Sequence, residues 1–210
     1  MVRRSNIESA MFEVSAFVPM LAFIVSLGAI GAIFALGGTA LVKPDFDFFP
    51  PPSKESWQHK AFMSLFRLFV YPLFALSVMT FDSSRASFTS PSFMAGVLLV
   101  LIGFGLAFWI TGQMGWCNAF GEKRGLVTDG WFRWSRNPVY VTTWLGLLGW
   151  ALVVGNALVS VLLALWALLY VFAPLSEEPW LIRMYGNAYE SYMRRTPRFL
   201  GRSPEAGPKL

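Results

Sequence analysis

The stretch NPVYVTTWLGLLGWALVVGNALVSVLLALWALLYVFAPLS, residues 137–176, decides the fold, because its 40 consecutive residues carry no charged side chain. As one helix it would be about 60 Å long, which is roughly twice the hydrocarbon core of a bilayer. The stretch must therefore turn, and Gly155-Asn156 is its turn-type break. The sequence predicts a hairpin of two membrane-spanning helices, with Gly146 and Gly149 as close-packing positions.

Two other uncharged runs, residues 14–42 and 86–121, are also long enough to span. The chain is 55% hydrophobic and 14% charged, against about 25% charged in a soluble domain. Upstream of the hairpin we expect crossings near residues 16–42, 61–81 and 93–111. The second crossing contains Arg67, which can reach the interface from a helix end. The first run is too long for a cleaved signal peptide, so it predicts a retained helix.

These crossings predict an all-α polytopic membrane protein with about five transmembrane helices. Residues 1–90 would form two helices joined by a loop rich in proline and aromatic residues. Residues 91–210 would form the functional core, made of three helices and an interfacial C-terminal helix.

The distribution of positive charge predicts which side the termini face. With five crossings, fourteen Lys and Arg residues lie on the side of the C-terminus and three lie on the other side. This bias predicts a cytosolic C-terminus, and we expect a bacterial inner (plasma) membrane. The net charge of +5 indicates topology and contact with anionic lipids, and nucleic acid is not an expected partner.

The cysteine and histidine counts exclude several kinds of chemistry. Cys117 is the one cysteine and His59 the one histidine. An intrachain disulfide, a multi-cysteine zinc site and a histidine-based metal cluster are therefore excluded within one chain, and no metal is expected.

Two polar clusters, residues 126–140 and 176–200, flank the hairpin. Asn137-Pro138 predicts a helix start with proline at its first position. Ser176 predicts the cap of a new helix that opens with two carboxylates. Because a hairpin brings its ends together, we expect one pocket that contains Arg136, Asn137, Tyr140, Glu177 and Glu178. This mixture of groups favours a zwitterionic or multiply polar cofactor.

Structural interpretations of the same residues stay open. The glutamate pair could cap a helix, and the arginines could only set topology. A tyrosine stripe could form an interfacial belt at helical spacing; its members are Tyr185, Tyr189 and Tyr192. Gly103 and Gly105 could serve helix packing. The loop of residues 43–60 could be a simple connector or a lid that contacts substrate.

Taken together, the two clusters resemble the isoprenylcysteine carboxyl methyltransferases and the related phospholipid methyltransferases. The first cluster carries LVTDGWFRWSRNPVY, residues 126–140, and the second carries EEPWL, residues 177–181. After these comes YGNAYESYMRRTPRF, residues 185–199. The resemblance covers residues 126 onward, and two separate motifs agree across a hairpin of suitable length.

The resemblance implies a methyltransferase that uses S-adenosylmethionine at the cytosolic membrane face. It implies catalytic roles for Arg136, Tyr140 and Glu178, and substrate contacts for Arg136, Tyr189 and Arg198. The implied cofactor-binding residues are Leu126, Val127, Asn137, Tyr140, Glu177, Glu178, Gly103 and Gly105. The acceptor would be lipophilic or anchored to a lipid, with a carboxylate, amine or thiol as the methylated group.

Two alternatives stay open at this point. One is a nicotinamide-dependent membrane reductase of the sterol-reductase type, which uses NADPH. The other is a non-catalytic membrane protein with a degenerate site. The sequence does not indicate the acceptor or the oligomeric state.

Overall fold

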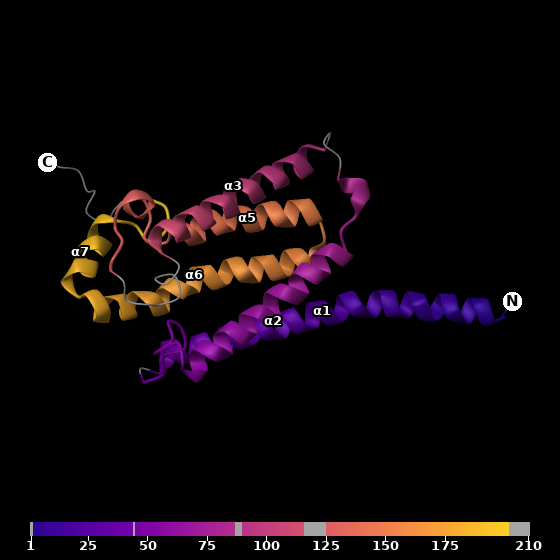
Figure 1. Cartoon of the computed structure of the whole chain (residues 1–210), viewed down its shortest axis with the longest axis horizontal. Helices are drawn as coiled ribbons and strands as arrows, with labels where there is room; N and C mark the ends of the chain where they lie inside the picture. Colours follow the sequence, from indigo (N-terminus) through magenta and orange to yellow (C-terminus); the bar gives the residue numbers. More distant parts are fainter. Residues whose placement is uncertain (1, 44, 87–89, 116–124, 202–210) are drawn as a thin grey trace.

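The structure is a computed structural model that describes residues 2–43, 45–86, 90–115 and 125–201; Cys117, Lys123 and Arg124 lie outside this part. The described residues form helices and no strand, which confirms the predicted all-α class. The elements are α1 (Val2–Val42), α2 (Trp57–Met79), the 3-10 helix η1 (Ser83–Arg85), α3 (Pro91–Met114), the 3-10 helix η2 (Gly130–Arg133), α5 (Pro138–Val154), α6 (Ala157–Tyr185) and α7 (Asn187–Arg195). Figure 1 shows α7 and the loop between α1 and α2 at the same end of the bundle.

The long helices confirm a polytopic membrane protein. Four segments are long and apolar enough to cross a membrane: Phe17–Val42, Trp57–Met79, Pro91–Met114 and Ala157–Tyr185. Helix α5 has 17 residues, or about 25 Å, which is at the lower end of the range for spanning helices. Arg67 is exposed on α2 and does not interrupt it. The fourth predicted crossing, which is the first helix of the hairpin, thus corresponds to the shorter α5.

The predicted hairpin turn is present between α5 and α6. Gly155 ends α5 with a φ of 61°, in the left-handed region, which a glycine adopts at little cost. The side-chain oxygen of Asn156 then caps α6, accepting hydrogen bonds from the backbone nitrogens of Leu158 at 2.9 Å and Val159 at 3.2 Å. The start of α5 also agrees with the sequence, because Pro138 is its first residue.

Helices α3 and α5 approach closely through glycines on both sides. A Cβ added to Gly103 would lie 2.2 Å from the backbone nitrogen of Gly146, and one added to Gly149 would lie 2.6 Å from the carbonyl oxygen of Gly96. Small residues let two membrane helices pack backbone to backbone. Gly146 and Gly149 are therefore packing positions as predicted, and the helix they contact is α3.

Replacing Gly103 by alanine should destabilise this helix pair. We expect Gly103→Ala to lower the free energy of unfolding by about 1–3 kcal/mol, because the new methyl group would overlap backbone atoms that cannot move aside. The measurement is denaturant-induced unfolding in detergent micelles.

The matched control is Gly105→Ala on the same helix, where a Cβ would meet nothing within 4 Å. It should be neutral or stabilising by up to about 1 kcal/mol, since alanine is the better helix former. Equal losses of stability in the two variants would contradict the packing role of Gly103.

Polar side chains tie the remaining helices together inside the bundle. The Ser26 hydroxyl donates to the carbonyl oxygen of Phe69 at 3.0 Å and links α1 to α2. The indole nitrogen of Trp150 on α5 donates to Ser77 Oγ on α2 at 3.1 Å. The indole nitrogen of Trp144 donates to the carbonyl oxygen of Ala167 on α6 at 3.0 Å. Helix α6 also packs against α1, α2 and α5, so it joins the two helix pairs.

The predicted helix start at Ser176 is wrong. Helix α6 continues through Ser176 and ends at Tyr185, with Pro174 and Pro179 inside it. The break comes at Gly186, whose φ is 53°, because a positive φ suits glycine. Helix α7 therefore begins ten residues later than the sequence indicated, at Asn187, with Gly186 at the cap position predicted for Ser176. As a result both glutamates lie on the last turns of a long helix.

Candidate functional site

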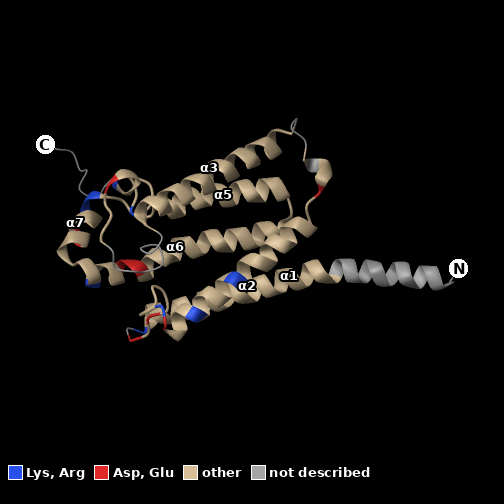
Figure 2. Ribbon diagram, in the orientation of Figure 1, with Lys and Arg blue, Asp and Glu red and all other residues tan. Residues whose placement is uncertain are grey.

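A cavity of about 740 Å³ lies at the α7 end of the bundle. Figure 2 shows that most charged residues of the described chain gather at this end. The cavity has a polar part, lined by residues of the segment before α5, of α5, of α6 and of α7, and an apolar part, lined by residues of α1, α2 and the loop between them. Its volume is within the range of about 300–1,000 Å³ that small-molecule sites occupy.

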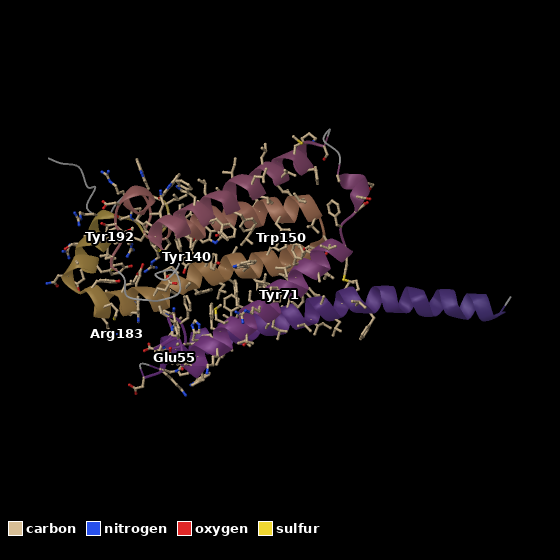
Figure 3. All side chains as sticks on the ribbon, viewed as in Figure 1. Glu55, Tyr71, Tyr140, Trp150, Arg183 and Tyr192 are labelled. Carbon is tan, nitrogen blue, oxygen red and sulfur yellow. The ribbon has the colours of Figure 1, made fainter. Side chains whose placement is uncertain are left out.

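The polar part contains one carboxylate with a phenol bound to it. The Tyr140 hydroxyl donates a hydrogen bond to Glu177 Oε1, and both residues line the cavity. The Tyr140 ring stacks on Tyr170, with centroids 4.4 Å apart. Figure 3 shows Tyr140 beside α6 at the end of the bundle that carries α7. The stacking and the hydrogen bond together fix the direction of the Glu177 carboxylate.

Glu178, the next residue, points into a network of two arginines. Arg198 donates to it from Nε at 2.8 Å and from Nη2 at 2.6 Å, in the paired geometry that favours arginine–carboxylate contacts. Arg136 Nη1 lies 3.1 Å from Glu178 Oε1, and the side chains of this pair are 9% and 8% exposed. Glu178 and Arg198 do not line the cavity, whereas Arg136 does. Glu178 is thus the buried counter-charge of a cavity-lining guanidinium.

Arg136 retains hydrogen-bonding capacity at the cavity. Its Nε and Nη1 are buried and have no hydrogen-bond partner among the described residues; the contact of Nη1 with Glu178 has the distance of an ion pair without the alignment of a hydrogen bond. Buried donors without a partner are rare and unfavourable. The site therefore fits a ligand that brings a carboxylate or another anionic group to Arg136.

Two segments that are far apart in the sequence, residues 135–137 and 196–198, are joined by hydrogen bonds. We call these two segments the clasp. The backbone nitrogen of Arg136 donates to the carbonyl oxygen of Pro197 at 2.9 Å. Asn137 Nδ2 donates to the carbonyl oxygen of Arg198 at 3.0 Å. These bonds fix the residues before α5 to the segment that follows α7.

Helix α7 closes the polar part through two buried tyrosines. The Tyr192 hydroxyl donates to the carbonyl oxygen of Phe132 at 2.6 Å. Tyr189 lines the cavity and is 3% exposed. Burial raises the pKa of Tyr189 to about 12, with Glu178 adding to the rise and Arg136 opposing it. The phenol therefore keeps its proton at neutral pH and can act as a donor.

The apolar part is walled by phenylalanines. Phe49 stacks on Phe62 with centroids 4.6 Å apart, and Phe62 stacks on Phe66 at 5.9 Å. Phe48, from the same loop as Phe49, is 1% exposed and meets Phe62 edge to face. All four line the cavity. This part of the cavity thus presents an aromatic, apolar surface.

The structure brings most of the expected site residues together. Those that line the one cavity are Leu126, Val127, Arg136, Asn137, Tyr140, Glu177 and Tyr189. Gly103 and Gly105 do not line it: Gly103 packs on α5, and Gly105 is exposed on α3. The alternative interpretation of the tyrosine stripe as an interfacial belt does not hold for Tyr189 and Tyr192, because both are buried inside the protein.

The sequence analysis named none of the phenylalanines of the apolar part, although it left open that the loop of residues 43–60, which contains Phe48 and Phe49, contacts substrate. They come from residues 48–66, far from both motifs, and the proline and aromatic richness of the loop was the signal that could have found them. The described residues also contain no group of three or more His, Cys, Asp or Glu side chains that could hold a metal ion.

Comparison with known proteins identifies relatives of part of the chain. Residues 91–188 match the family model described as phospholipid methyltransferase. The chain is 32% identical over 133 residues to the cobalt-zinc-cadmium resistance protein CzcN of Cupriavidus metallidurans. These 133 residues are 61% of this chain and 59% of that protein. It is 36% identical over 74 residues to the protein-S-isoprenylcysteine O-methyltransferase of Schizosaccharomyces pombe, covering 34% of this chain and 31% of that protein.

The chain thus spans less than two thirds of the length of each of these relatives. No solved structure matches it significantly. The family match contains Arg136, Tyr140 and Glu177 from the polar part of the cavity, and it does not reach the phenylalanines of residues 48–66.

Proposed function

Because residues 91–188 belong to the family of isoprenylcysteine carboxyl methyltransferases and phospholipid methyltransferases, we propose that the protein is a membrane methyltransferase that uses S-adenosylmethionine. The acceptor is a lipophilic or lipid-anchored molecule with a carboxylate, amine or thiol. The observation that carries the proposal is one cavity that joins a charged end to an apolar end.

The charged groups of the cavity suit the amino-acid part of the cofactor. Arg136 has two donors, Nε and Nη1, that form no hydrogen bond within the described part of the chain and suit a carboxylate, and Glu177 offers a carboxylate to an ammonium group. Asn137, Tyr140 and the backbone at Leu126 and Val127 line the same part. When bound, S-adenosylmethionine supplies a methyl group that is already activated on a sulfonium, so the protein has mainly to align the acceptor.

The other predicted residues have supporting roles in this proposal. Glu178 and Arg198 act as positioning residues, because they hold Arg136 and do not line the cavity. Tyr189 lies at the polar part as a neutral donor and could contact the acceptor head. Residues 91–210 would then form the cofactor core, and the helices of residues 1–90 would form the acceptor wall.

The apolar part supports a lipophilic acceptor. Its lining by Phe48, Phe49, Phe62 and Phe66 would bury the hydrocarbon portion of the acceptor, which is favourable by about 25 cal/mol per Å². The acceptor would enter from the bilayer, and the soluble cofactor would enter from water. With the bias of fourteen positive residues to three, we place the C-terminus and the charged end in the cytosol, at a bacterial inner membrane.

A ligand-binding experiment tests the cofactor. The purified chain in lipid nanodiscs should bind S-adenosylhomocysteine by isothermal titration calorimetry and should show no thermal shift with NADPH. Absence of S-adenosylhomocysteine binding by folded protein would refute the proposal, and a shift with NADPH alone would favour the reductase alternative.

A transfer experiment then tests the reaction. Labelled methyl groups should pass from the cofactor into a lipid extract of the host, and mass spectrometry of the product identifies the acceptor. Cofactor binding without transfer to any extract would leave the non-catalytic alternative as the better account.

A further inference from the structure

Two tryptophans outside the spanning helices are exposed at the α7 end of the bundle. Trp134 is 76% exposed and Trp131 is 41% exposed. They are three positions apart at the 3-10 helix η2, and residues at this spacing eclipse one another in a 3-10 helix. Both indoles therefore project from one side of η2, which we call the tryptophan face.

The tryptophan face is held rigidly on the bundle. Phe132, between the two tryptophans, is 8% exposed and belongs to a buried cluster with Ile110, Tyr189 and Tyr192. Its carbonyl oxygen accepts the hydrogen bond from Tyr192. Phe132 thus fixes the backbone of η2, from which the two indoles project.

The position of η2 along the bundle indicates the level of the membrane at which the tryptophan face lies. Trp134 is four residues before Pro138, the first residue of α5, so it lies about one turn beyond the start of an apolar helix. Tryptophan is enriched at this level of a membrane, where its ring meets the acyl chains and its N–H meets the headgroups.

Basic residues surround the same place. Arg133 is exposed on η2, and Arg194 and Arg195 are exposed in the last turn of α7, which the Tyr192–Phe132 bond ties to η2. The acidic side chains on these elements are Asp129 and Glu190. The three arginines outnumber the two carboxylates, and each basic residue near an anionic membrane surface contributes about 1 kcal/mol of attraction.

We propose that Trp131, Trp134 and Arg133 form a contact with anionic phospholipids in the headgroup layer. The contact is independent of the proposed methyl transfer. The contact restricts the motion of the clasp. Trp134 is two residues before Arg136, and the backbone nitrogen of Arg136 donates to the carbonyl oxygen of Pro197. The lipid contact thus lies within two residues of a guanidinium that lines the cavity.

Quenching by brominated lipids tests this contact on the full chain in nanodiscs. The signal is the difference in emission between the wild type and the Trp131→Phe/Trp134→Phe variant. Lipids brominated near the headgroup should quench it more than lipids brominated deep in the chain. Brominated phosphatidylglycerol should reach half-maximal quenching at roughly one fifth of the mole fraction needed by brominated phosphatidylcholine, the preference expected from one surface arginine.

Two variants act as controls. Trp109→Phe removes a 63% exposed indole near the end of α3, and its difference signal should be quenched by both lipids without preference between them. Arg133→Gln should reduce the preference for phosphatidylglycerol and keep the quenching.

Three results would overturn the proposal. Quenching of the difference signal by aqueous iodide and not by lipid would place the face in water. Shielding from both quenchers would indicate a protein contact, such as a second copy of the chain. Equal quenching by the two lipids would exclude a preference for anionic headgroups.

Discussion

Glu178→Ala should lower the free energy of unfolding by about 3–5 kcal/mol, because it leaves a buried guanidinium without its counter-charge. Arg136 and Glu178 are 9% and 8% exposed, and Arg198 would lose both of its bonds to the same carboxylate. Binding of S-adenosylhomocysteine should be lost as well, since Arg136 would no longer be held at the cavity. Denaturant titration in micelles and calorimetry measure the two effects.

The protein provides a matched control in a second acid–arginine pair. Asp47 lies 3.2 Å from Arg183, but these side chains are 50% and 57% exposed. Exposed pairs contribute roughly 0–1 kcal/mol, so Asp47→Ala should change stability little. If the two alanine variants lost the same stability, Glu178 could not be the counter-charge described here.

Glu177→Gln should weaken binding of S-adenosylhomocysteine roughly 10- to 100-fold with little loss of stability. The carboxylate lines the cavity, and a hydrogen bond to a charged group contributes about 1.5–3 kcal/mol. Glutamine keeps the shape and can still accept the bond from Tyr140, so the fold should survive. Calorimetry of the purified variant measures the affinity, and its unfolding curve confirms the fold.

Two further variants serve as comparisons, one expected to leave the affinity unchanged and one expected to reduce it less. Glu190→Gln removes an exposed carboxylate on α7 that does not line the cavity, and its affinity should match the wild type. Tyr140→Phe removes the phenol hydroxyl and keeps the ring stacked on Tyr170, so we expect a smaller loss than for Glu177→Gln. Unchanged affinity in Glu177→Gln would exclude this carboxylate from the binding site.

The contrast between the two glutamates shows where sequence reasoning stops. Adjacent residues in one motif were both expected to bind cofactor. On a helix, neighbours are about 100° apart, since 3.6 residues complete a turn. Glu177 therefore lines the cavity with Tyr140, while Glu178 turns toward Arg136 and Arg198. The role of each glutamate thus depends on the side chains that its side of the helix meets, and these side chains come from other segments of the chain.

Local features were predictable because they depend on the residues themselves. The absence of charge over residues 137–176 requires a membrane setting, and its length requires a turn, for which Gly155-Asn156 is suited. From that turn alone it follows that the two ends of the hairpin meet, as the Tyr140–Glu177 bond shows. The helix end was misplaced at Ser176 because a proline-containing turn of α6 can persist when its neighbours pack well.

By itself, then, the sequence determined the membrane class, the hairpin and the meeting of its polar ends, because hydrophobic length and turn chemistry act over short distances. Only the tertiary structure decided that Gly103 meets α5 and that Glu178 is a counter-charge. The tertiary structure also decided that the phenylalanines of residues 48–66 line the same cavity as residues of the segment 126–140. These features depend on which helix faces of distant segments pack together, and one segment's pattern does not specify its partner.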